Sequence, residues 1–178
     1  MCLTNPTSNF TILKSKEDVT CYKVLAVEDG VLATPYTHTD VNINDIKRGK
    51  PFVATGYKGL LKRKNKIFKD FVTGTDTIRG GAIHTYRDLE DAKNADRIYF
   101  SNNGIDIVIF ECVIPKGTNY VEGYAPVGRR GYCSPKIVFK KVAGVIDNGN
   151  WNSIYRDDLD LDDVEKTFFN IKNLEASK

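Results

Sequence analysis

The sequence predicts an α+β protein with a single mixed or mostly antiparallel sheet and two main helices packed on it. Two observations lead to this class. β-Forming residues gather in separate runs, of which the strongest are 105–114 and 136–146. Apolar residues at helical spacing follow Thr85 and Asp160. A chain of 178 residues is expected to fold as one domain over 1–178.

The first elements predicted are a strand pair. Residues 20–27 are rich in β-formers, 28–30 have the composition of a hairpin turn, and 31–34 are predicted to return as the second strand. From 36 to 80 no pattern decides between helix and strand. Loop is favoured for 36–55 and for the glycine-containing residues 73–81.

The stretch 80–93 is the best candidate region for a site. It predicts a glycine turn, a short strand that carries His84, and a helix whose cap Thr85 would form with Asp88. A histidine in a strand is also a common packed or hydrogen-bonded structural residue. Both interpretations of His84 remain open at this point.

The second half of the chain starts with the run 105–114, which is so continuously apolar that it predicts a central strand covered on both faces. Residues 117–135 contain four glycines and are predicted to be a loop-rich excursion. The strand 136–146 is expected to bend near Gly144, and a hairpin turn at 147–150 follows.

The C-terminal helix is expected to begin near Asp158 or Asp160 and to dock on the sheet. The acidic run 158–163 imitates the first ligands of a calcium loop, but it lacks the required glycine and the final glutamate. A helix N-terminus explains these carboxylates, so no metal is expected.

Four cysteines, at positions 2, 21, 112 and 133, include no C-x-x-C pair, so zinc has no support. Those at 21, 112 and 133 are expected to be reduced and buried. Cys2 would be an N-terminal nucleophile if Met1 were removed, but Leu3 stands where class II amidotransferases have glycine. No cofactor is expected for a binding protein of this kind.

Candidate ligand contacts come from two segments. Around His84, two arginines add charge for an anionic ligand; the segment 117–135 contributes tyrosines and arginines, a composition favoured at recognition surfaces. The predicted set is Arg79, His84, Tyr86, Arg87, Tyr124, Arg129, Arg130 and Tyr132. If the protein is an enzyme, His84 and Tyr86 are the predicted catalytic residues.

Charge and hydropathy limit the partners. The net charge is +3, and no apolar run is long enough to span a bilayer, so no membrane partner is expected. The N-terminus has no secretory signal pattern, and a cytoplasmic location is expected. The basic segment 58–69, flanked by Tyr57, either binds nucleic acid or forms a solvated charged face.

Four stretches resemble a group of small uncharacterised proteins from gut bacteria and their phages, a resemblance spread over roughly residues 1–140. They are Met1-Cys2-Leu3, Cys21-Tyr22-Lys23-Val24-Leu25, Gly81-Ala82-Ile83-His84-Thr85-Tyr86 with Glu90-Asp91-Ala92, and Cys112-Val113-Ile114-Pro115-Lys116-Gly117. The resemblance implies a phage or mobile-element setting and no catalytic residues.

The order of elements is also similar to the NAD-binding core of ADP-ribosyltransferase-like folds. In that comparison His84 and Tyr86 would flank nicotinamide, and Lys23 stands where that family often has arginine. No late glutamate is well placed to orient the ribose.

We therefore expect a non-catalytic phage-type or mobile-element accessory protein that binds a small ligand or a macromolecular partner. One alternative is an NAD- or nucleotide-dependent transferase, for which NAD would be the cofactor. A second is a nucleic-acid-binding protein that uses 58–69.

Overall fold

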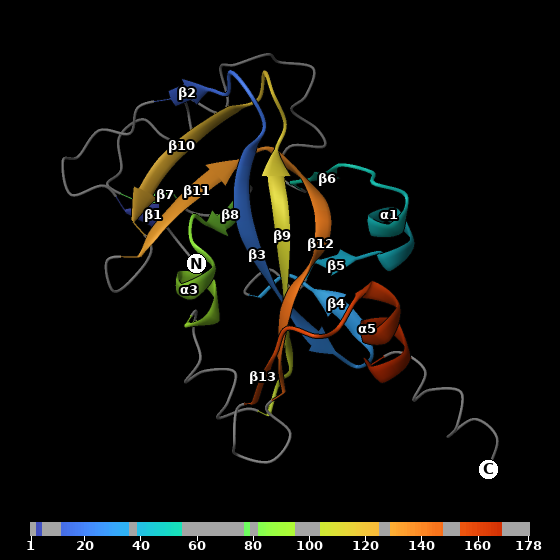
Figure 1. The fold of residues 1–178 in the computed structure, drawn as a ribbon. Coiled ribbons are helices and arrows are strands. Elements are labelled where there is room, and N and C mark those ends of the chain that lie inside the picture. The colour runs from blue at the N-terminus through green and yellow to red at the C-terminus, as the bar shows by residue number, and fades with distance from the viewer. Residues whose placement is uncertain are drawn as a thin grey trace, which may run out of the picture.

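The computed structural model describes residues 3–4, 12–35, 39–54, 77–78, 82–94, 104–124, 129–147 and 154–168. In these ranges the protein is one large sheet with a few short helices (Figure 1), and every strand pairing among them is antiparallel. Of the two predicted forms of a single sheet, mixed or mostly antiparallel, the structure has the mostly antiparallel one. The sheet dominates the fold, since the longest described helix has only 8 residues.

The strands in chain order are β1 (Leu3–Thr4), β2 (Ile12–Lys14), β3 (Val19–Glu28), β4 (Val31–Ala33), β5 (Asp40–Val41), β6 (Phe52–Val53), β7 (Thr77–Ile78), β8 (Ile83–Tyr86), β9 (Ile107–Ile114), β10 (Asn119–Tyr124), β11 (Arg130–Ser134), β12 (Lys136–Asp147) and β13 (Ile154–Arg156). The helices are α1 (Ile43–Lys47), α3 (Leu89–Lys93) and α5 (Leu161–Phe168). The main path through the sheet is β13-β12-β9-β3-β8-β11-β10-β1-β7, with β2 on β10, β4 on β3, β5 on β4 and β6 on β12.

β9 is the central strand of the sheet. It pairs with β3 over eight positions, from Val19 opposite Ile114 to Ala26 opposite Ile107, and with β12 on its other edge. All residues of β9 except Glu111 are buried. The prediction of a strand covered on both faces is therefore confirmed.

The predicted hairpin between β3 and β4 is also confirmed. Asp29 and Gly30 form a two-residue connection, with Glu28 opposite Val31. Their φ angles are 50° and 72°. Positive φ at both positions is what a type I′ turn requires, and Asp-Gly is among the sequences that adopt it most readily.

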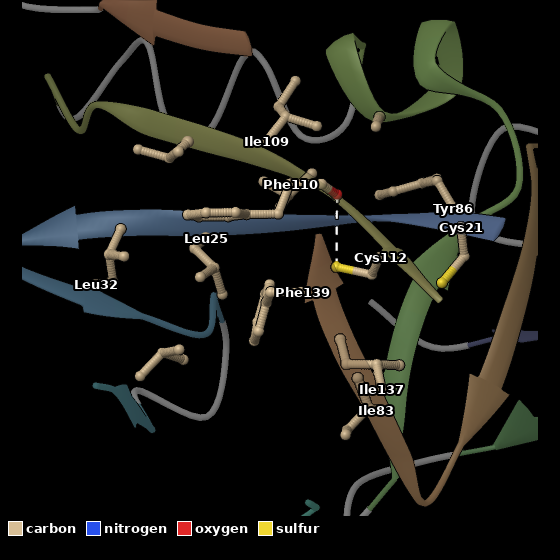
Figure 2. Packing of buried hydrophobic residues seen from close by; sticks show 14 of the residues in the cluster. Cys21, Leu25, Leu32, Ile83, Tyr86, Ile109, Phe110, Cys112, Ile137 and Phe139 are labelled. Atoms are coloured by element: carbon tan, nitrogen blue, oxygen red, sulfur yellow. Dashed lines mark hydrogen bonds between the residues drawn. The ribbon is translucent and has the colours of Figure 1, made fainter. Parts of the chain in front are cut away.

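The core lies on both faces of the β3–β9–β12 unit. Directly opposite residues of an antiparallel pair project to the same face, so one face carries Leu25, Phe110, Cys112 and Phe139, as Figure 2 shows. The Phe110 and Phe139 rings meet edge to face, with centroids 5.1 Å apart. On the sheet's other face, α3 packs against β3 and β8.

The helix predicted after Thr85 is shorter and starts later than expected. Thr85 belongs to β8, where it pairs with Tyr132, and α3 begins at Leu89 after the extended N-cap residue Asp88. Because the backbone of Thr85 is part of the β8–β11 pairing, Thr85 does not serve as the N-cap of the helix. With five residues, α3 is not a main helix, so that part of the prediction is wrong.

The prediction of a loop for 117–135 is wrong, because β10 and β11 form an antiparallel pair there. Two of the glycines that suggested loop, Gly123 and Gly131, stand opposite each other in the ladder. Between 36 and 80, β5, α1, β6 and β7 occupy positions where only loop was favoured.

The C-terminal helix begins as predicted. The Asp160 carboxylate accepts the backbone N–H groups of Asp162 and Asp163, both at 2.9 Å, and so caps α5. Lys47 of α1 bonds Asp162 at 2.6 Å and Glu165 at 2.7 Å, which fixes α5 beside α1. Val164 is fully buried, so this helix docks on the core as expected.

None of the helices in the described part of the chain has the length and apolar character needed to cross a membrane.

The predicted irregularity near Gly144 is confirmed as a register shift of β12 against β9, between Val142 and Gly144. A Cβ at position 144 would lie 2.3 Å from the Tyr155 ring. This ring of β13 crosses Gly144, its hydroxyl donates to the Ala143 carbonyl at 2.8 Å, and the Lys93 ammonium lies 4.2 Å from its centroid.

We expect Gly144→Ala to destabilise the protein by about 1–2 kcal/mol, because the ring must move away and lose both contacts. Urea unfolding of Gly144→Ala, Tyr155→Ala and the double variant measures this. Since both single changes disrupt the same contacts, the double variant should lose less than the sum. Strictly additive losses would contradict the proposed packing.

Candidate functional site

The two segments predicted to contact a ligand lie side by side in the structure. β8 pairs with β11, and β11 pairs with β10. These three strands are neighbours at one side of the central unit, as Figure 1 shows. Residues 83–87 therefore share one surface with 119–124 and 130–134, which lie far from them in the sequence.

The register fixes which side chains share a face of these strands. The Arg87 N–H donates to the Arg130 carbonyl at 3.1 Å, so Arg87 stands opposite Arg130, and Tyr124 lies opposite Arg130 on the other side. The next row, two residues along each strand, is Glu122, Tyr132 and Thr85. Both rows project to the same face, because side chains alternate with a period of two.

We name this surface the tyrosine–arginine face, formed by Arg87, Tyr120, Glu122, Tyr124, Arg130 and Tyr132. Its outer residues are exposed, Tyr124 to 37%, whereas Tyr132 is buried. The Tyr120 and Tyr132 rings pack edge to face with centroids 5.6 Å apart. Burial raises the pKa of the Tyr132 phenol, and the nearby Glu122 carboxylate raises it further.

The charges on the tyrosine–arginine face are only partly compensated. Arg87 donates to the Glu122 carboxylate at 3.3 Å, and both side chains are about 40% exposed. Such an exposed pair contributes little to stability. The Arg130 guanidinium forms no ion pair with any residue in the described ranges, and the Arg130 backbone N–H donates to the Asp91 carboxylate at 3.2 Å.

His84 and Tyr86 lie on the opposite face of the same strands. Tyr86 stands opposite Tyr22 of β3, and His84 stands opposite Cys133 of β11. Both residues are buried. The structure thus separates His84 and Tyr86 from Arg87, Tyr124, Arg130 and Tyr132, with which they were grouped.

The His84 imidazole is buried, and its two ring nitrogens are the polar atoms of interest. Neither Nδ1 nor Nε2 is bonded to any residue that the structure describes. Burial, and secondarily the positive charge of Lys23, lowers the pKa of His84 to about 3, so the ring is neutral at physiological pH. An unbonded buried polar atom costs on the order of 1–3 kcal/mol, which a purely structural histidine would normally avoid.

Lys23 is the one residue of this region that the sequence indicated only through the ADP-ribosyltransferase analogy. Its side chain is 9% exposed, and its ammonium donates to the His84 backbone carbonyl at 3.0 Å. Burial lowers the pKa of Lys23 to about 8, and the neighbouring cysteine thiols partly offset this effect. A lysine in a strand gives no sequence signal that its ammonium will be buried.

The cysteines around Lys23 behave as predicted for buried, reduced residues. Cys21 and Cys112 are free thiols, and these two residues and Cys133 are fully buried. Burial raises the pKa of the Cys21 thiol to about 12 and that of Cys112 well above its ordinary value, so neither is a nucleophile at neutral pH. Within the described ranges, no group of three or more His, Cys, Asp or Glu side chains is placed to hold a metal.

Several predicted residues are not placed by the structure. Arg79, Cys2 and the basic segment 58–69 lie outside the described residues. Arg129 is described, directly before β11, and is half-buried.

The fold and these surfaces define a sheet-dominated α+β protein with a partly exposed tyrosine–arginine face, a buried histidine on the opposite face of β8 and a buried lysine on β3. No protein-family model matches the chain, and searches of curated proteins and of solved structures also give no match.

The buried ammonium of Lys23 makes a specific prediction about pH. The pKa is about 8 in the folded protein and near 10.5 in an exposed lysine. Below pH 8 the ammonium is charged in both states. Between pH 8 and 10.5 the unfolded chain binds more protons, so the contribution of Lys23 to stability rises with pH by about 3 kcal/mol.

We expect Lys23→Met to remove this rise, measured by urea unfolding between pH 7 and 10. The difference between wild type and variant isolates Lys23, because the thiols and phenols that titrate in the same window are common to both proteins. Lys140→Met, at an exposed lysine of β12, is the matched control and should leave the pH profile unchanged. An unchanged profile in Lys23→Met would show that its ammonium is not buried.

Proposed function

We propose that this protein is a phage-type or mobile-element accessory protein that acts by binding a ligand or macromolecular partner without catalysis. One observation carries the binding role. Four of the eight residues predicted to contact a ligand, Arg87, Tyr124, Arg130 and Tyr132, share one face of adjacent strands. The phage setting rests on the resemblance of the sequence stretches.

The composition of the tyrosine–arginine face supports a binding role. Tyrosine and arginine are enriched among the residues that dominate binding energy, since each combines a large contact area with a directional polar group. Here the tyrosines are held on strands, so little side-chain freedom is lost on binding. Arg130, with no ion pair in the described part of the chain, is available to an anionic group.

The state of the titratable groups supports a binding protein over a catalyst. The thiols of Cys21 and Cys112 are protonated and buried, and the imidazole of His84 is held neutral on the other side of the sheet. These groups face away from solvent, whereas the exposed groups of the tyrosine–arginine face are two arginines, a glutamate and tyrosines.

The binding proposal is tested with the double variant Tyr124→Ala/Arg130→Ala. We expect a ligand from a panel of NAD, ADP-ribose, mononucleotides, sulfated sugars and short oligonucleotides to raise the melting temperature of the wild type by about 5 °C or more at 100 times its dissociation constant. The double variant should lose that shift.

The matched control is Ile154→Ala/Arg156→Ala on β13, at the far end of the sheet path, which should keep the shift. Both double variants should retain the melting temperature of the free protein within a few degrees, because the residues removed are exposed. A ligand that shifts wild type and Tyr124→Ala/Arg130→Ala equally would place the binding site elsewhere.

A second candidate function is an NAD- or nucleotide-dependent transferase. The observation in its favour is the pair of unbonded ring nitrogens of His84, the residue whose backbone carbonyl accepts a hydrogen bond from the Lys23 ammonium; no described residue bonds these ring nitrogens. Residues that serve function at the expense of stability are a known signature of ligand sites. On this reading NAD would enter between β3 and β8.

For this candidate we expect His84→Leu to abolish a melting-temperature shift caused by NAD or ADP-ribose while raising the stability of the free protein, because two unbonded buried nitrogens are removed. Differential scanning fluorimetry measures both. Tyr124→Ala/Arg130→Ala serves as the control and should keep the NAD shift. If NAD gives no shift in wild type, the transferase reading is rejected.

A further inference from the structure

We propose that the tyrosine–arginine face binds single-stranded nucleic acid. This inference rests on the binding function proposed above and assigns its ligand class. The two observations behind it are the row of one tyrosine and two arginines across adjacent strands, and the continuation of that row by further aromatic and apolar side chains on the same face.

Two arginines on the tyrosine–arginine face provide the positive charge for a phosphate. Arg87 and Arg130 stand directly opposite each other on neighbouring strands, where like charges repel. Glu122, diagonal to Arg130, is bonded to Arg87 at 3.3 Å, and the Arg130 guanidinium has no carboxylate partner among the described residues. A phosphate beside this row would compensate the remaining charge, and guanidinium groups bind phosphate in a bidentate manner.

Tyr124, the tyrosine of the same row, provides a ring on which a base can stack beside the phosphate. Tyr124 lies opposite Arg130, is 37% exposed, and therefore presents part of its ring to solvent next to the cations. An aromatic ring beside a phosphate site is the arrangement that binds a base and its backbone together, since every base has a face that can stack.

The length of the face favours a polymer over a mononucleotide. Tyr120 and Tyr124 are four residues apart on β10, which corresponds to about 13 Å. Leu13 of β2 stands opposite Tyr120 and is 37% exposed, so the apolar part of the surface continues onto a fourth strand. Several successive nucleotides are needed to cover a surface of this extent. An open sheet with exposed aromatic side chains is a common platform for single strands.

A duplex fits this face less well. In double-stranded DNA or RNA the base faces are stacked within the helix, so Tyr124 would have no base to contact. The chemistry therefore specifies unpaired bases, and sequence preference is expected to be weak, because stacking and phosphate contacts tolerate every base.

The experiment uses the full chain and 5′-fluorescein-labelled dT15 and U15, with a 15-base-pair duplex for comparison, in fluorescence anisotropy between 50 and 200 mM NaCl. We expect the single strands to bind more tightly than the duplex. Tyr124→Ala should weaken binding by at least fivefold, and Tyr124→Phe should restore most of it, because the ring and not the hydroxyl stacks.

Arg130→Gln should reduce the slope of log K against log[NaCl] by about 0.7, the value for one phosphate contact on a single strand. Arg156→Gln, an exposed arginine of β13 paired with Asp158, is the matched control and should leave the slope unchanged. Photo-crosslinking of a 5-bromouracil oligonucleotide, read by mass spectrometry, should label a peptide that contains Tyr120 or Tyr124. This readout does not depend on any variant.

The possible outcomes test nucleic-acid binding separately from the binding function on which it rests. If no single strand binds at 50 mM NaCl, the nucleic-acid inference is overturned, and the binding function stands if another ligand of the panel is lost in Tyr124→Ala/Arg130→Ala. If single strands bind wild type and these variants equally, and crosslinks map to 58–69, the tyrosine–arginine face is excluded as the nucleic-acid site.

Discussion

β8 and β4 both pair with one edge of β3 but at different positions along it, and the rest of the structure depends on this split. β8 pairs with β3 only at Tyr22, while β4 pairs with it from Ala26 to Glu28. Between these two paired regions the Lys23 side chain, and not a backbone N–H of β3, supplies the hydrogen-bond donor to β8. Along a strand, successive residues direct their N–H and C=O groups alternately to the two neighbouring strands. Arg87 directs its N–H toward β11, so the carbonyl of His84, three residues earlier, points toward β3. The Lys23 ammonium bonds that carbonyl at 3.0 Å.

The split gives the two halves of the sheet different surroundings. Around β9, both faces are covered, and the strand is apolar almost throughout. On β10 and at the start of β11 the coverage is one-sided: Val121 and Cys133 are fully buried, whereas Glu122 and Arg130 on the other face are exposed. Further along β11 both faces are covered, since Tyr132 and Ser134 are also buried. The one-sided part makes a binding face available beside a closed core.

The sequence predicted correctly those turns and helix ends whose structure is determined by neighbouring residues. The Asp29-Gly30 turn and the cap at Asp160 are examples, because a positive φ and an N-terminal carboxylate each have a short-range cause. Elsewhere, strand pairing between distant segments determined the structure against the local sequence pattern. Gly123 and Gly131 suggested loop but face each other across a ladder, and Thr85 had the spacing of a cap but is held in β8.

The candidate site was predictable in composition and not in arrangement. His84 and Arg87 are three residues apart, but a strand places them on opposite faces, and a helix starting at Thr85 would not have done so. That Arg87, Arg130 and Tyr124 form one row depends on a register between distant segments, which no local pattern encodes. The burial of Lys23 has the same non-local origin.

Lys23 links the buried interior to the tyrosine–arginine face. A buried ammonium is costly, and an apolar side chain would fill the same volume at lower cost. Its hydrogen bond is, however, a side-chain contact between β3 and β8, two strands that share one pair of opposed residues. Since β8 is paired with β11, and β11 with β10, this contact contributes to the position of Arg87, Arg130 and Tyr124 relative to the core. The charge is therefore best understood as fixing the orientation of the outer strands, a role that an apolar residue of equal size does not fill.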